Sequence, residues 1–180
     1  MGMRVILWSL VLGLAIAVGT APAAAQMTAA GTQEIGVSGL VDFDSANGTL
    51  IHFNLLYGLF VADGVEVAGT AGVTDDDNHT VWRIGGVMEY DYDLGLELVP
   101  YLGAAAGLAK YEVEKSGTRK ARDDYAFFLG AAVGSKYFLA ENVALDVALK
   151  LEWASDDIYP EDDDFQNTDA RITLGMRFFF

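Results

Sequence analysis

The sequence predicts an all-β fold, an eight-stranded antiparallel up-and-down β-barrel, and three observations support this prediction. Apolar and polar side chains alternate in eight segments, short and long connectors alternate between those segments, and the last segment ends in aromatic residues. Successive side chains of a strand point to opposite faces, so a period of two places one set of residues on each face of a sheet. The eight segments are 34–43, 51–61, 65–73, 82–92, 98–113, 125–139, 143–153 and 171–180.

Residues 1–25 are expected to form a cleaved signal peptide that lies outside the barrel. Arg4 precedes an apolar run over 5–19, and Ala23-Ala24-Ala25 closes the segment. A basic start, an apolar centre and an A-x-A end are the signature of secretory signals. The apolar run is shorter than the about 20 residues of a spanning helix. We therefore predict cleavage after Ala25 and a barrel domain over residues 26–180.

The seventh predicted strand shows the alternation most clearly, and the fifth shows it least. Segment 98–113 has alanine and glycine at positions of both faces, so the pattern does not assign its faces. In segment 143–153 the polar face carries Asp146, Lys150 and Glu152. The apolar face of the same segment carries Val143, Leu145, Val147, Leu149, Leu151 and Trp153.

The connectors predict the topology. Gly, Asn and Asp favour tight turns, and they occur in three short connectors. The remaining connectors are polar and mostly longer, so one rim of the barrel should carry short turns and both chain ends, and the other rim should carry loops. The short connectors are 62–64, 92–97 and 140–142, and the longer ones are 44–48, 75–79, 114–124 and 155–168.

Whether the apolar face points into or out of the barrel distinguishes a soluble barrel from a membrane barrel. A soluble barrel of lipocalin type places its apolar face inside, whereas a transmembrane barrel places it outside, between aromatic girdles. Aromatic residues lie near the strand ends on the apolar face, at Phe43, Trp82, Tyr90, Tyr92, Tyr125, Tyr137, Trp153, Phe178 and Phe180. The opposite face has charges of both signs that could pair in a lumen, chiefly Arg83, Glu89, Lys136, Asp146, Lys150, Glu152, Arg171 and Arg177. These features favour the transmembrane barrel, and the lipocalin-type barrel stays as the alternative.

The end of the sequence has a recognisable pattern. From Thr173 to Phe180 the chain reads polar, any, glycine, any, any, aromatic, any, aromatic. This pattern resembles the C-terminal assembly signal of bacterial outer-membrane barrels, and the matching residues are Thr173, Gly175, Phe178 and Phe180. The resemblance implies that the barrel-assembly machinery is a partner during insertion.

The mature chain as a whole resembles the small eight-stranded outer-membrane barrels. This group includes the membrane domain of outer-membrane protein A and the opacity-type porin-family proteins. The residues that carry the resemblance are PYLGAAAG at 100–107 and FLGAAVGSKYFLAENVAL at 128–145, followed by the aromatic end. The resemblance implies location in the outer membrane of a Gram-negative bacterium and contact with its lipids and lipopolysaccharide. It implies little about function, because the group is functionally mixed.

Composition and size exclude several function classes. The formal charge is −15, from 26 acidic and 11 basic residues, which is the wrong sign for binding nucleic acid through charge. The absence of cysteine excludes a thiolate zinc site and a cysteine nucleophile. Eight strands leave an interior that side chains can fill, whereas a large aqueous pore needs about 16 strands. We expect a structural or surface-interaction role, in adhesion or envelope integrity, with a narrow channel or transporter for small or hydrophobic solutes as the alternative.

No enzyme activity and no cofactor are expected. The two histidines are His52, on the inward face of the second strand without a serine two residues on, and His79, in an outer loop beside Asp75, Asp76 and Asp77. An Asp/His cluster could act on a water, but such a group is more often a solvated loop tip. Clustered carboxylates suit divalent cations, so two acidic runs are candidates for ions shared with lipopolysaccharide. Their residues are Asp75, Asp76, Asp77, Asp162, Asp163 and Asp164. A basic run could instead contact lipid phosphates or a host surface, through Lys115, Arg119, Lys120 and Arg122.

Overall fold

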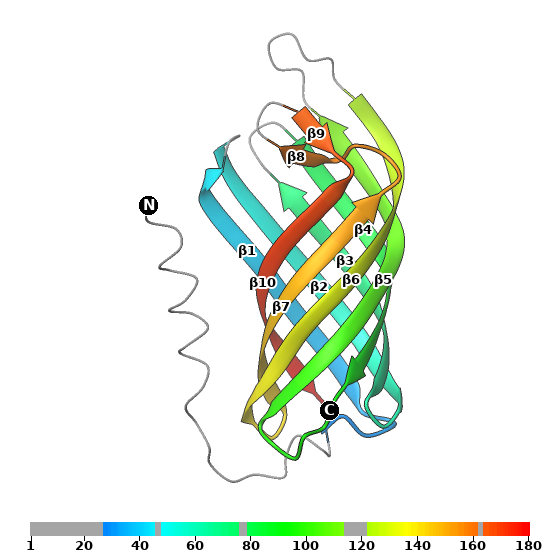
Figure 1. Ribbon diagram of the computed structural model, residues 1–180, viewed down its shortest axis with the longest axis vertical. Helices are drawn as coiled ribbons and strands as arrows, with labels where there is room; N and C mark the ends of the chain where they lie inside the picture. Colours follow the sequence, from blue (N-terminus) through cyan, green and yellow to red (C-terminus); the bar gives the residue numbers. More distant parts are fainter. Residues whose placement is uncertain (1–26, 46–47, 76–78, 114–121, 162–163) are drawn as a thin grey trace.

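In the computed structural model the chain closes into a barrel of eight antiparallel strands (Figure 1), which confirms the predicted fold class. The structure describes residues 27–45, 48–75, 79–113, 122–161 and 164–180. The predicted signal peptide lies outside these residues. No helix in the described part of the chain is long and apolar enough to span a membrane. The barrel strands are β1 (Gln33–Ser45), β2 (Gly48–Ala62), β3 (Val65–Asp75), β4 (His79–Asp91), β5 (Leu98–Val113), β6 (Arg122–Ala140), β7 (Val143–Ala154) and β10 (Thr168–Phe179).

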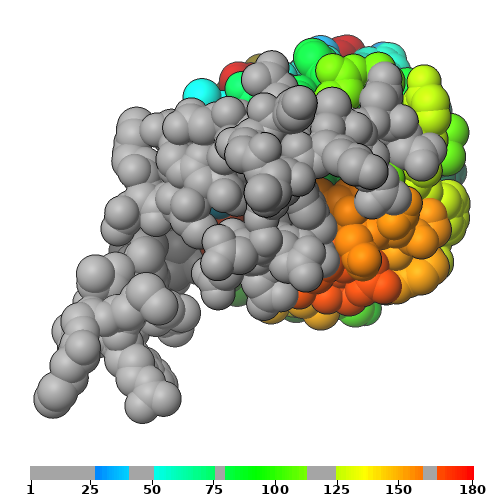
Figure 2. Space-filling model, turned by 90° about the horizontal axis from the view of Figure 1, so that it is seen from above, coloured from blue at the N-terminus to red at the C-terminus, as the bar shows by residue number. Residues whose placement is uncertain are grey.

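Each barrel strand pairs with the barrel strands that precede and follow it in the sequence, so β7 pairs with β10. The ring closes where β10 pairs with β1. The barrel register continues from Glu34↔Phe179 to Gly39↔Leu174 along this closing pair. Figure 2 looks down on one rim, where residues of β6, β7 and β10 follow one another in yellow, orange and red. Two short strands, β8 (Tyr159–Glu161) and β9 (Asp164–Gln166), pair with each other in a separate two-stranded sheet.

The two ends of the barrel differ as the connectors predict. One end, here called the turn end, holds the connections β2–β3, β4–β5 and β6–β7 together with both ends of the described chain. Gln33 N–H donates to the Phe180 carbonyl at 2.8 Å across the closing pair. Gly64, with φ at +72°, makes the tight β2–β3 turn. The opposite end, here called the loop end, carries the longer connections, including loop four (residues 155–167) with its β8–β9 hairpin.

The apolar face of the barrel points outward. On β2, Leu55 and Tyr57 are 45% and 54% exposed, whereas Leu56 between them is 5% exposed. The same alternation holds along β7, where Leu149 and Leu151 are exposed and Ala148 is buried. A large contiguous apolar surface is unusual for a soluble monomer and fits a surface covered by lipid. This arrangement is the opposite of the lipocalin-type alternative.

The structure also assigns the faces of β5, which the sequence pattern left open. Val99, Tyr101, Ala109 and Tyr111 are buried and point inward, whereas Leu102, on the other face, is 51% exposed. Between the two inward tyrosines the inward positions are Gly103, Ala105 and Gly107. The small residues leave space in the middle of the lumen, and the tyrosines fill it toward both ends.

Candidate functional site

The charged side chains inside the barrel form two separate clusters, one at each end of the lumen. The cluster near the turn end, here called the turn-end cluster, joins seven charged residues from six strands. Lys136 lies at its centre and is fully buried, with Nζ 3.0 Å from Glu34 and 2.9 Å from Asp91. Its members are Glu34, Glu66, Glu89, Asp91, Lys136, Asp146 and Arg177.

Arg177 links the remaining members of the turn-end cluster. Its Nε donates to Asp146 at 3.0 Å, its Nη1 donates to Glu34, and its Nη2 donates to Glu89 at 3.3 Å. Tyr101 fixes the other oxygen of Asp146 by donating its hydroxyl at 2.9 Å. Position 134 must be glycine for this arrangement, because a Cβ there would lie 2.5 Å from the Tyr101 ring. The aromatic rings of Phe60, Tyr101 and Phe179 stand 5.3–5.8 Å from the Lys136 ammonium.

The turn-end cluster has more acids than bases. Five carboxylates face two cations, and all seven side chains are at most 5% exposed. Ion pairs at this depth are stable only when their partners are complete, because each charge has lost its hydration. Among the described groups, Glu66 Oε1 and Asp91 Oδ1 have no hydrogen-bond donor. The cluster is therefore held together by Lys136 and Arg177, each of which contacts at least three carboxylates.

An apolar layer lies beside the turn-end cluster, toward the chain ends. Phe60, Phe138 and Phe179 pack together, with ring centroids 6.5 Å apart for Phe60–Phe179 and 5.0 Å apart for Phe138–Phe179. Met27 packs against this layer from the segment that precedes β1. Gly31 N–H in the same segment donates to the Phe60 carbonyl at 2.8 Å. The segment thus lies across the turn end of the lumen.

The second cluster, here called the loop-end cluster, consists of Arg83, Glu152, Asp169 and Arg171. Glu152 accepts from Arg83 Nε at 3.1 Å and from Arg171 Nη2 at 2.8 Å. Asp169 forms an ion pair with Nη1 of Arg171. Two carboxylates face two guanidinium groups, so this cluster is balanced. Opposite charges in the lumen are therefore paired locally, and the excess of acid lies at the turn end alone.

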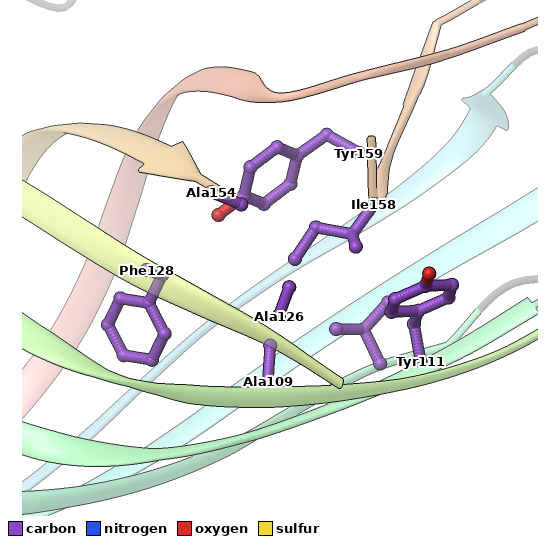
Figure 3. Close-up of a cluster of buried hydrophobic side chains, with 8 residues drawn as sticks. Ala109, Tyr111, Ala126, Phe128, Ala154, Ile158 and Tyr159 are labelled. Carbon is purple, nitrogen blue, oxygen red and sulfur yellow. The ribbon is translucent and has the colours of Figure 1, made fainter. Parts of the chain in front are cut away.

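Loop four folds into the loop end of the barrel (Figure 3), and its Tyr159 contacts the loop-end cluster. Figure 3 shows Ile158 and Tyr159 pointing toward strand residues such as Ala126 and Ala154. Tyr159 is 3% exposed, donates its hydroxyl to Glu152 and lies under Arg83, whose guanidinium carbon is 5.4 Å from the ring centroid. Burial, reinforced by the Glu152 charge, raises the pKa of Tyr159, so its hydroxyl remains a donor.

A small cavity separates the two clusters. Its volume is about 70 Å³, and its lining includes His52, Lys150 and Glu152 together with the small inward residues Gly103 and Gly130. His52 Nδ1 lies 2.8 Å from the Thr74 hydroxyl, to which Arg83 also donates at 2.7 Å. A histidine beside a hydroxyl and an arginine lacks the carboxylate that would orient it as a general base. The His79 side chain lies outside the described residues.

The predicted lumen charges fall into these clusters with one exception. Glu89, Lys136, Asp146 and Arg177 belong to the turn-end cluster, and Arg83, Glu152 and Arg171 belong to the loop-end cluster. Lys150 lines the cavity between them. The prediction missed Glu34 as a lumen charge, although it shares a strand face with Gly36 and Ser38 and the alternation could have identified it.

Most of the predicted ion-binding loop residues lie outside the described part of the chain. Asp76, Asp77, Asp162 and Asp163 are among them, and of Asp164 only the backbone is described, in β9. Asp75 is exposed, and its carboxylate accepts a hydrogen bond from Thr80. Within the described ranges no group of three or more acidic or histidine side chains is arranged to hold a metal. The basic run with Lys115, Arg119 and Lys120 is also outside these ranges, and the Arg122 side chain is not described.

Three residues of the predicted assembly signal lie on the two faces of β10, and Phe180 directly follows its end. Thr173 is 1% exposed and points into the lumen, as does Gly175. Phe178 and Phe180 are 42% and 59% exposed on the outer face, where they extend the aromatic residues of the turn end. Phe179 between them points inward and belongs to the apolar layer.

Solved structures of outer-membrane barrels are similar to this fold. Neisserial surface protein A is 18% identical, with a TM-score of 0.59 and coverage of 83% of this chain and 95% of that one. The N-terminal β-barrel domain of Pseudomonas aeruginosa OprF is 19% identical, with a TM-score of 0.61 and coverage of 84% and 98%. OprG from the same organism is 15% identical, with a TM-score of 0.51 and coverage of 86% and 98%.

These identities establish similarity of fold alone. No functionally curated protein matches the sequence. The model of one family, described as the outer membrane protein beta-barrel domain, matches residues 11–178, which is nearly the whole chain. The outward apolar face, the charged lumen and this match agree, so the chain belongs to the outer membrane protein β-barrel domain family and is a protein of the outer membrane.

Proposed function

We propose that the protein is a closed outer-membrane barrel that acts at the cell surface through its loops, in adhesion or envelope integrity, and does not conduct solutes. The observation that supports this proposal most is that both ends of the lumen are occupied by side chains. The turn-end cluster and its apolar layer occupy one end, and loop four with Ile158 and Tyr159 occupies the other. The cavity between them has a volume of about 70 Å³, which supports a lumen filled mainly by side chains.

The proposed role is non-catalytic. His52 lies among hydroxyl and guanidinium groups, and the lumen carboxylates are engaged with cations, so neither is available to activate a water or a nucleophile. Members of the family are outer-membrane barrels and generally not enzymes. The proposed partners are the lipids and lipopolysaccharide around the barrel, the barrel-assembly machinery during insertion, and surface ligands that contact the loops. The mature chain is proposed to begin at residue 26, after removal of residues 1–25.

Surface display of loop four can be tested by cysteine labelling, because the chain has no cysteine of its own. Asn167 lies in loop four and Glu141 in the β6–β7 turn, and both side chains are exposed. We expect Asn167→Cys to react with a membrane-impermeant maleimide on intact cells. Glu141→Cys, the matched control at the turn end, should react only after the outer membrane is permeabilised. Equal labelling of the two positions on intact cells would contradict the proposed orientation.

The surface role makes a separate prediction for cells. A strain without the protein should lose surface binding or become more sensitive to detergent, because loops and envelope contacts are missing. Its uptake of small solutes should be unchanged, because a closed barrel contributes no diffusion path. Slower solute uptake with normal binding and normal detergent resistance would favour the channel alternative instead.

A further inference from the structure

Two acidic side chains lie directly opposite each other inside the turn-end cluster. Glu66 on β3 and Glu89 on β4 are register partners, and Asp91 follows two residues later on the same face of β4. All three residues are at most 4% exposed. Like charges directly opposite in a sheet destabilise it, and carboxylates that share a buried site favour a proton on one of them. One of these three groups is therefore expected to be neutral.

The contacts with cations distinguish Glu66 from the other two acids. Glu89 lies within 3.3 Å of both Lys136 and Arg177. Asp91 lies 2.9 Å from Lys136. In the described part of the chain, Glu66 has an ion pair with Lys136 alone, and its 3.4 Å is the longest of the four that Lys136 makes. A negative charge on Glu66 would therefore be compensated least.

The other surroundings of Glu66 also favour its neutral form. Its neighbour across the sheet on β2 is Phe60, which offers no hydrogen-bond donor. Its Oε1 atom lies against Gly58 of the same strand, so closely that a Cβ at position 58 would be 1.7 Å away. Among the described groups, Oε1 has no hydrogen-bond partner. A buried carboxylate oxygen without a donor has lost its hydration, and the group takes up a proton instead.

The charge balance of the surrounding groups leaves room for this proton. Five carboxylates of the turn-end cluster face two cations, and Lys150, which lines the same cavity as Glu89, adds a third at the edge. Two carboxylates remain in excess even when Lys150 is counted. The charged and titratable groups around Glu66 come from β1, β4, β5, β6, β7 and β10, and they are Glu34, Glu89, Asp91, Tyr101, Lys136, Asp146, Lys150 and Arg177.

We propose that Glu66 is a proton-binding site of the lumen, that it holds its proton at neutral pH, and that this proton stabilises the closed barrel. Glu66 Oε2 accepts from Lys136, a hydrogen bond that the carbonyl oxygen of a neutral carboxyl group retains. An unfolded glutamate is ionised above about pH 5, so the folded barrel carries one proton more than the unfolded chain. Stability therefore falls as the pH rises, until Glu66 is ionised in the barrel as well.

Infrared spectroscopy of the barrel in vesicles tests the site directly, because a protonated carboxyl group has its own carbonyl band, which shifts in D₂O. We expect the wild type to show this band at neutral pH and Glu66→Gln to lose it. Glu141→Gln is the matched control, since Glu141 is exposed in the β6–β7 turn, and it should keep the band. No such band in the wild type, or an unchanged band in E66Q, would overturn the proposal.

Unfolding by urea at a series of pH values gives the second readout. Above about pH 5 the unfolding equilibrium constant of the wild type should rise relative to that of E66Q, by up to about tenfold per pH unit. E141Q should follow the wild type, and parallel profiles of wild type and E66Q would contradict the proposal. If E66Q does not fold, carbon-13 labelling of glutamate carboxyl groups in the wild type decides. A band that shifts on labelling supports a glutamate site, and a band that does not shift overturns it.

Discussion

Replacing Lys136 with methionine is expected to destabilise the barrel more than any other single change in the lumen. Methionine fills a similar volume, so the expected effect comes from charge and not from a cavity. Lys136 lies within 3.4 Å of Glu34, Glu66, Glu89 and Asp91, and all of these groups are buried. Removal of one partner from a buried ion pair costs about 3–5 kcal/mol, because the other charge stays buried without compensation. The free energy of unfolding, from urea titrations in phospholipid vesicles, measures the loss.

Two control variants make this prediction specific. Lys110→Met removes a half-exposed lysine from its pair with Glu112, and solvent-accessible pairs contribute about 0–1 kcal/mol. Glu66→Gln removes one carboxylate from a cluster that has too many, and Glu66 Oε1 has no donor, so this variant should lose little stability. The double variant K136M/E66Q should be more stable than K136M. A K136M barrel as stable as K110M would show that the turn-end cluster does not hold the lumen together.

Deletion of Phe180 is expected to reduce outer-membrane assembly in cells to a small fraction of the wild-type level. The deletion removes an outward aromatic ring and two backbone hydrogen bonds with Gln33, of 2.8 Å and 3.0 Å, that close β10 onto β1. The first loss is expected to affect the proposed recognition of the terminal pattern, and the second is expected to affect closure of the barrel itself. Immunoblots of outer-membrane fractions measure the assembled protein.

Phe180→Ala separates the two contributions, because it keeps the backbone pair and removes only the ring. If the ring is recognised during assembly, F180A should assemble poorly in cells but fold normally into vesicles from urea. Leu174→Ala is the matched control, since Leu174 is also outward on β10 and is 54% exposed, but lies at an unspecified position of the pattern. Normal insertion of F180A in cells would mean that the aromatic terminus is not an assembly signal.

The strands and their faces could be predicted from the sequence because the membrane imposes a regular pattern. Lipid requires an apolar residue at every second position of a strand, and strands such as β2 and β7 obey this rule over most of their length. The rule does not assign β5, where Ala104 and Ala106 face outward and Gly103 and Ala105 face inward. Alanine and glycine are small enough for either face, so the inward and outward residues of β5 can be told apart only in the closed barrel.

The pairing inside the lumen could not be predicted, because barrel closure brings together residues far apart in the sequence. Lys136 meets Glu34 across 102 positions, and Arg177 meets the same glutamate across 143. Period two predicts that such residues share the interior, but not their height along the barrel axis. The separation of the lumen into an acid-rich turn end and a balanced loop end follows from strand register, which short sequence patterns do not encode.

Loop four also differs from its prediction as a plain polar connector. Its acidic composition indicates a hydrated segment, yet Ile158 and Tyr159 are 1% and 3% exposed and pack inside the barrel mouth. Asp156 accepts a hydrogen bond from the Tyr111 hydroxyl at 2.9 Å, so part of the acidic run serves to hold the loop inward. A few apolar residues among many acids were the signal in the sequence, and most partners of Ile158 and Tyr159 lie on β5 and β6.

Single-channel recording in planar bilayers tests the central claim, a lumen closed at both ends, most directly. The purified barrel, with insertion verified by the mobility difference between boiled and unboiled samples, should give no steady conductance above the lipid background. The turn-end cluster occupies one end of the lumen and loop four packs into the other, so the account predicts no continuous path for ions. Stable, uniform openings of the wild-type barrel at low voltage would contradict the account and would establish a channel.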